Sequence, residues 1–296
     1  MCPTSIVGHM MSTGDMGPTS PVDSPMRIAF STLAFPNATL ASAVSLGRRW
    51  GYAGVELRLI DGELIDPSMP AAERARVKRA LAGLPVVAVD SSIRLTDDDS
   101  GLPLRRFLQL ASDWGAPLVR VFGGALSISG PASGPDPQAR QNRLRAAARV
   151  LESSVPLARR LGVAIGVETH DDFSASAVVA ELLAMADPEW VGAVWDSHHP
   201  HRTGERPADV YANLGRRILL VQVKDARRER AGDWRLVLLG EGEVPVRQML
   251  GLLAAGGYRN WVSVEWEKRW HPEIEAPEVA LPQYRRVLAE WMEVSS

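Results

Sequence analysis

The chain of 296 residues has little cysteine, little lysine and no surplus of either charge. Its single cysteine, Cys2, excludes an intrachain disulfide, which is usual in a reducing compartment, and we therefore expect a cytoplasmic protein. A formal net charge of −2 gives no basic footprint for nucleic acid or for an anionic membrane. No stretch approaches the ~18 consecutive apolar residues of a membrane span. These absences leave a small molecule as the expected partner, with no nucleic acid and no membrane.

The scarce residue types point to one part of the chain. Only Lys78, Lys224 and Lys268 are lysines among 33 basic residues, and Lys224 lies in an apolar run. Four of the six histidines fall between positions 170 and 201. This clustering is the first sign of a functional site.

The first 25 residues differ from the rest of the chain. They are rich in Ser, Thr, Pro, Gly and Met, carry few charges and have no apolar periodicity, which predicts a disordered leader over residues 1–25. They lack the basic start and the apolar stretch of a signal peptide. The methionines between positions 10 and 26 leave open whether this segment belongs to the natural chain.

From Met26 onward, short apolar runs alternate with longer amphipathic segments. The runs are bounded by turn residues, which is typical of strands, and the longer segments have helical periodicity. The predicted strands are residues 27–32, 54–58, 85–90, 117–122, 163–168, 191–196, 218–224 and 261–265. The predicted helices are residues 40–50, 71–82, 104–114, 139–161, 176–186, 208–214, 246–255 and 278–292.

This alternation predicts a single (β/α)8 TIM barrel of the α/β class over residues 26–296. Eight such units over about 270 residues match the usual length of the fold, and continuously apolar strands are typical of a parallel sheet covered by helices. An open doubly wound sheet is the alternative, but no Gly-rich dinucleotide loop follows the first predicted strand. Residues 226–242 form a long connection, and such loops often serve the active site of a barrel.

Polar residues stand at the ends of the last four predicted strands. Glu168 follows GVAIGV, Asp196 follows VGAVW, Gln222 interrupts LLVQV, and Glu265 follows WVSV. Because parallel barrel strands end at one mouth, these side chains should meet there. Three carboxylates and an amide oxygen form a hard site that suits one divalent ion, with Mn²⁺, Mg²⁺ or Co²⁺ favoured and Zn²⁺ as the less suited alternative.

Lys224 shares a strand face with Gln222 and should enter the mouth beside the metal. Its ammonium could hold a substrate oxygen, act as acid or base, or simply pair with Asp196 or Glu265. Glu267 lies on the same face as Glu265 and is the alternative ligand if the strand register differs. We favour Glu265 because it ends the apolar run.

Three further charged residues lie in earlier strands. Glu56 and Arg58 share a face of the second predicted strand, and Arg120 lies among apolar residues of the fourth. A buried arginine needs a partner, so Arg120 either pairs with an inward carboxylate or contacts an anionic or hydroxyl-rich ligand.

Two histidines fall just past metal-site candidates, in the predicted loops above the mouth. His170 is two residues after Glu168, and His199 is three after Asp196. A neutral imidazole there can bind metal, orient a substrate hydroxyl or transfer a proton. The expectation for His201 is a surface position in a polar loop.

Several strings resemble those of the sugar phosphate isomerase/epimerase superfamily, which has a xylose isomerase-like barrel. The similarity extends from Met26 to the C-terminus, and the order of the motifs carries it. The strings are GVELR (54–58), VRVFGG (119–124), GVETH (166–170), WDSHH (195–199), VQVKDA (221–226), GEGEVP (240–245) and VEWEKRWHPEI (264–274).

The resemblance implies a metal site and part of a substrate site. Ketose 3-epimerases of this superfamily hold one divalent metal with Glu, Asp, His and Glu. Those ligands correspond here to Glu168, Asp196, Gln222 and Glu265, so that Gln222 stands where the family usually has His. The resemblance also implies that His199 contacts substrate and that Arg228 falls near an epimerase arginine, whereas Ser174 replaces a substrate-binding Glu.

We therefore expect a divalent-metal-dependent isomerase or epimerase of a ketose, an inosose or a related polyhydroxy carbonyl compound. Glu168 and Glu265 would remove and return a proton next to the carbonyl, and the metal and Lys224 would stabilise the enediolate. An inosose-type dehydratase and a non-catalytic sugar-binding protein are the alternatives. A nuclease like endonuclease IV is disfavoured by the net charge and by Gln222 in place of a histidine. A homo-oligomer is compatible with such a barrel.

Overall fold

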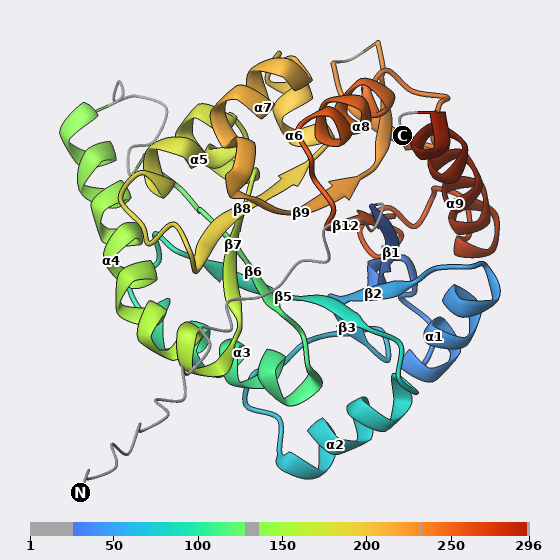
Figure 1. Ribbon diagram of the computed structural model, residues 1–296, viewed down its shortest axis with the longest axis horizontal. Helices are drawn as coiled ribbons and strands as arrows, with labels where there is room; N and C mark the ends of the chain where they lie inside the picture. The colour runs from blue at the N-terminus through green and yellow to red at the C-terminus, as the bar shows by residue number, and fades with distance from the viewer. Residues whose placement is uncertain (1–25, 128–135, 231, 295–296) are drawn as a thin grey trace, which may run out of the picture.

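The computed structural model describes residues 26–127, 136–230 and 232–294, so the predicted leader lies outside the described residues. Eight parallel strands close into a barrel in the order β1-β12-β9-β8-β7-β6-β5-β2, with helices around it (Figure 1). The strands are β1 (Arg27–Ser31), β2 (Gly54–Leu57), β5 (Val86–Arg94), β6 (Leu118–Phe122), β7 (Ala164–Glu168), β8 (Val191–Asp196), β9 (Ile218–Val223) and β12 (Trp261–Val264). The predicted TIM barrel is confirmed.

The helices that surround the barrel agree with the predicted ones to within a few residues. They are α1 (Leu40–Arg49), α2 (Ala71–Ala80), α3 (Gly101–Trp114), α4 (Pro137–Leu161), α5 (Ser176–Leu183), α7 (Pro207–Leu214), α8 (Val246–Ala255) and α9 (Pro277–Val294). Local signals set several ends: Thr39 caps α1 by accepting from Ser42 N, and Gly162 ends α4 at a φ of 67°. No helix in the described part of the chain is long and apolar enough to cross a membrane.

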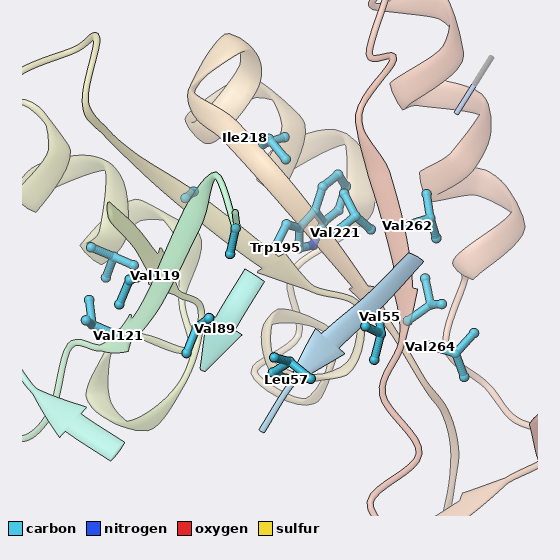
Figure 2. Packing of buried hydrophobic residues seen from close by; sticks show 14 of the residues in the cluster. Val55, Leu57, Val89, Val119, Val121, Trp195, Ile218, Val221, Val262 and Val264 are labelled. Carbon is cyan, nitrogen blue, oxygen red and sulfur yellow. The ribbon is translucent and has the colours of Figure 1, made fainter. Parts of the chain in front are cut away.

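The two faces of each strand have different surroundings. One face belongs to a large apolar cluster shared with the helices, part of which, including Val55, Leu57 and Val262, appears in Figure 2. The other face lines the barrel interior, where a smaller cluster including Leu118, Val194 and Leu220 fills the lower part. Both faces are therefore buried, as the continuously apolar strands predicted.

The upper part of the interior is polar. Along β7, Glu168 is two residues after Gly166, so both face inward. A Cβ on Gly166 would lie 2.7 Å from Val194 Cγ2, so only glycine fits at this position without a shift. The polar mouth thus lies directly above a packed apolar floor.

Three features were not predicted from the sequence. A short helix, α6 (His198–Arg202), follows β8 where a polar loop was expected. The long connection after β9 contains an antiparallel hairpin of β10 (Asp225–Arg228) and β11 (Trp234–Val237). A second hairpin joins β3 (Leu59–Ile60) and β4 (Glu63–Leu64).

Candidate metal centre at the barrel mouth

Buried polar side chains from successive strand ends meet inside the barrel. They are Glu56, Asp90, Arg120, Glu168, Asp196, Gln222, Lys224 and Glu265. Carboxylate oxygens of Glu168, Asp196 and Glu265 lie within 4.8 Å of one another and could hold a metal ion. The structure therefore brings together the three carboxylates that the strand ends indicated.

The amide of Gln222 is oriented by two carboxylates. Its Nε2 donates to Glu56 Oε1 at 2.8 Å and to Glu265 Oε1 at 3.2 Å. In this orientation the amide nitrogen faces both carboxyl groups. Its Oε1 is buried and accepts no hydrogen bond from a described residue. This free oxygen is what a metal ligand at position 222 requires.

Asp196 is held by the turn that follows β8. Its Oδ1 accepts from the backbone N–H groups of His198 at 2.8 Å and His199 at 2.9 Å, the first two residues of α6. Its Oδ2 lies 3.1 Å from Lys224 Nζ, without the angle of a hydrogen bond. One oxygen therefore fixes the side chain and leaves the other for a cation.

Lys224 lies among the same carboxylates. Its Nζ donates to Glu265 Oε2 at 2.6 Å and to Glu267 Oε1, and it lies close to Asp196 Oδ2. Burial opposes its charge, but the three carboxylates outweigh burial and raise the pKa of Lys224 well above its usual value. Glu267, the alternative ligand in the sequence, contacts this ammonium and is not part of the group of three.

Arg120 pairs with inward carboxylates, which was one of its two predicted roles. Its Nε lies 3.0 Å from Glu168 Oε2, and its Nη2 lies 3.3 Å from Asp90 Oδ2. Its Nη1 donates to the backbone oxygen of Ser91 at 2.8 Å. Asp90 was not among the predicted site residues, although it ends a predicted strand as the others do.

The buried cluster has more negative than positive side chains. Burial is the main reason why the pKa values of Glu56 and Asp90 are raised, and it raises the pKa of Glu168 to about 8. Six carboxyl groups lie near only three cationic side chains: Glu56, Asp90, Glu168, Asp196, Glu265 and Glu267 against Arg58, Arg120 and Lys224. A divalent cation fits this cluster because it could replace protons that the raised pKa values leave on these carboxyl groups.

Two histidines form a second, overlapping group with Glu168 that could also hold a metal ion. The rings of His170 and His199 have centroids 4.4 Å apart. Burial lowers the pKa of His199 well below its usual value, and both of its ring nitrogens lack hydrogen bonds to described residues. His170 Nδ1 lies 2.8 Å from Asp171 Oδ1; burial opposes its charge, but Asp171 and Glu168 raise its pKa.

Of the remaining predicted site residues, Arg58 lies beside the buried cluster and Arg228 lies outside it. Arg58 is buried next to the cluster, and its Nη1 donates to Ser92 Oγ at 3.0 Å. Arg228 is exposed on β10, with its guanidinium carbon 6.0 Å from the ring centroid of Trp234. The structure does not bring Arg228 into the cluster, because the hairpin directs it elsewhere. Trp234 in turn contacts the ring of His198, at 5.2 Å between centroids.

Comparison with known proteins supports the same fold. A curated inosose dehydratase from Lacticaseibacillus casei is 24% identical over 127 residues, which are 38% of this chain and 43% of the relative, so the chain spans less than half of that relative. The solved structure of the IOLI protein with a zinc atom has a TM-score of 0.73 at 16% identity, covering 92% of this chain and 99% of that one. For L-ribulose 3-epimerase the TM-score is 0.70 at 16% identity, with 91% and 95% covered.

The family model described as xylose isomerase-like TIM barrel matches residues 44–291. That match extends over most of the chain and contains every buried residue of the candidate metal centre. The protein therefore belongs to the xylose isomerase-like TIM barrel family, as its motifs predicted.

Proposed function

We propose that this protein is a divalent-metal-dependent isomerase or epimerase of a ketose, an inosose or a related polyhydroxy carbonyl compound. The observation that carries the proposal is the buried group of Glu168, Asp196 and Glu265, joined by the free amide oxygen of Gln222. The family membership agrees with it, because relatives of this fold include an L-ribulose 3-epimerase and an inosose dehydratase.

Those four side chains would hold the metal. Their oxygen donors favour Mn²⁺, Mg²⁺ or Co²⁺, whereas Zn²⁺ would be better served by the group that includes His170 and His199. When bound, a divalent cation polarises a substrate carbonyl and acidifies the neighbouring C–H bond.

The chain's own carboxylates carry the proton transfer. Glu168 and Glu265 come from opposite sides of the Asp196 and Gln222 strands, so each can face one side of a substrate carbon. Burial raises the pKa of Glu168 to about 8 in the metal-free protein, and a bound cation would lower it, so that the ionised carboxylate is available as the base. Lys224, which stays charged, donates hydrogen bonds to the developing enediolate oxygen. Returning the proton to the other face gives epimerisation, and returning it to the next carbon gives isomerisation.

A lyase reaction is the second candidate. Loss of a β-hydroxyl needs an acid near the leaving oxygen, and His170 is an imidazole with a raised pKa, supported by Asp171, at the edge of the same site. The curated inosose dehydratase relative is consistent with this reaction.

Exchange of a substrate C–H proton with solvent tests the proposal. The chelated protein is supplied with Mn²⁺ in D₂O, and a panel of ketoses, inososes and hydroxypyruvate is followed by NMR. We expect metal-dependent deuterium incorporation that Glu168→Gln abolishes. Glu181→Gln, which alters a partly exposed carboxylate paired with Arg140, is the matched control. Undiminished exchange in Glu168→Gln would remove its catalytic role, and sugar binding without exchange would favour the non-catalytic alternative.

A further inference from the structure

Arg58 is a buried arginine that forms no salt bridge with a described residue. It directly follows β2, is only 7% exposed, and its backbone N–H donates to Thr32 Oγ1 at 2.9 Å. Its Nη1 donates to Ser92 Oγ at 3.0 Å and reaches the backbone oxygen of Asp90 at 3.5 Å. In the described part of the chain, no carboxylate oxygen lies within 4.0 Å of its guanidinium, and Nε and Nη2 donate no hydrogen bond.

The other two buried cations of the mouth are already engaged. Arg120 contacts Glu168 and Asp90, and Lys224 contacts three carboxylates. Burying an arginine without a partner is costly, so an unpaired one beside the candidate metal centre points to a ligand. The two free groups, Nε and Nη2, form the side edge of the guanidinium, which matches the two oxygens of a carboxylate.

The surroundings place this edge next to the reaction centre. The guanidinium carbon of Arg58 lies 5.9 Å from the centroid of the Phe122 ring, and the ring of His170 lies 4.4 Å from the same centroid. Phe122 is the register partner of Glu168 on the neighbouring strand. Burial lowers the pKa of Arg58 to about 10, and Asp90, Glu168 and Glu265 are near enough for their charges to oppose this shift. A molecule bound at the candidate metal centre can therefore extend to Arg58.

We propose that Arg58 binds a carboxylate of the substrate, so that the polyhydroxy carbonyl compound is a sugar acid; this inference rests on the function proposed above. A carboxylate is favoured over a phosphate because the mouth is rich in carboxyl groups and, among the described residues, offers one buried arginine without a salt bridge. A singly charged planar group suits one guanidinium edge, whereas a phosphate dianion would need further cations.

Three matched ligands test the inference with the Mn²⁺-loaded protein. D-Fructuronate, D-fructose and D-fructose 6-phosphate have the same ketose skeleton. They differ only at carbon six, which is a carboxylate, a hydroxymethyl group and a phosphorylated hydroxymethyl group, respectively. Isothermal titration calorimetry should show D-fructuronate binding roughly 10- to 100-fold more tightly than D-fructose, as expected of a charge-assisted hydrogen-bonded pair. In Arg58→Gln the ratio of the affinity for D-fructuronate to that for D-fructose should fall to about one, while one Mn²⁺ per chain is still bound. Arg58→Lys should recover part of the preference for D-fructuronate.

Arg94→Gln is the control for long-range charge. Arg94 is the register partner of Phe122 at the end of β5 but its side chain is 57% exposed, so its loss should leave the ratio unchanged. Equal binding of acid and neutral ketose, tighter binding of the 6-phosphate, or a preference that survives in Arg58→Gln would each overturn the inference. The last result would mean that the metal holds the carboxylate.

These outcomes are separate from those of the proposed function. An Arg58-dependent preference for the acid without any C–H exchange would retain the carboxylate site and reject the isomerase. Exchange of neutral ketoses, with no preference for the acid, would retain the isomerase and reject the carboxylate site.

Discussion

Removal of the Lys224 ammonium should destabilise the metal-free protein and make it more dependent on metal. The Nζ atom lies 2.6 Å from Glu265 Oε2 and 3.1 Å from Asp196 Oδ2, and the side chain is only 1% exposed. Removing one partner of a buried ion pair costs ~3–5 kcal/mol in the free energy of unfolding. In a domain of this size that loss corresponds to a fall in melting temperature of about 6–20 °C.

Thermal unfolding of Lys224→Met, with chelator and with saturating Mn²⁺, measures this effect. We expect the melting temperature to fall in chelator and to recover by more than half with Mn²⁺, because the metal neutralises the same carboxylates. Mn²⁺ should therefore raise the melting temperature of the variant more than that of the wild type. Lys78→Met on the exposed face of α2 is the control and should behave as the wild type.

Two results would refute this reasoning. Equal melting temperatures of Lys224→Met and wild type in chelator would mean that the ammonium does not stabilise the carboxylates. An equal Mn²⁺ shift in both proteins would mean that the metal and the ammonium do not neutralise the same groups.

Two further predictions concern the metal ligands. Burial raises the pKa of Glu168 to about 8 in the folded, metal-free protein, above its value in the unfolded chain. Between about pH 4.5 and 8 the folded protein therefore binds more protons than the unfolded chain. The melting temperature of the metal-free protein should fall as pH rises through that window, and the Mn²⁺ affinity measured by calorimetry should rise. A melting temperature that rises with pH, or an Mn²⁺ affinity that falls, would contradict the raised pKa of Glu168. Gln222→Leu removes an oxygen donor and the hydrogen bonds to Glu56 and Glu265, so we expect Mn²⁺ affinity to drop at least ~10-fold. Unchanged affinity in equilibrium dialysis would exclude Gln222 as a ligand.

The barrel could be predicted from sequence because its strands are buried on both faces and read as continuous apolar runs. The β3–β4 hairpin was missed although Asp61-Gly62 is a strong turn signal; both residues have positive φ, of 54° and 84°. Helix α6 was missed because His-rich sequence with Pro200 resembles a loop, whereas the Asp196 carboxylate accepts from its first two N–H groups.

The convergence of Glu168, Asp196 and Glu265 could be predicted because parallel barrel strands end at one mouth. What could not be predicted depends on the course of loops. The contact of Lys224 with Glu267 requires the chain to leave β12 in one particular direction. The position of Arg228 depends on a hairpin that the sequence did not reveal, and the lack of a salt bridge between Arg58 and the described residues is apparent only in three dimensions.

The most direct test of the metal centre is anomalous X-ray diffraction at the manganese edge from crystals of the Mn²⁺-loaded protein. We predict one strong peak per chain, within bonding distance of oxygens of Glu168, Asp196, Gln222 and Glu265. A map without a peak among these side chains, with the Lys224 ammonium still between Asp196 and Glu265, would contradict the account.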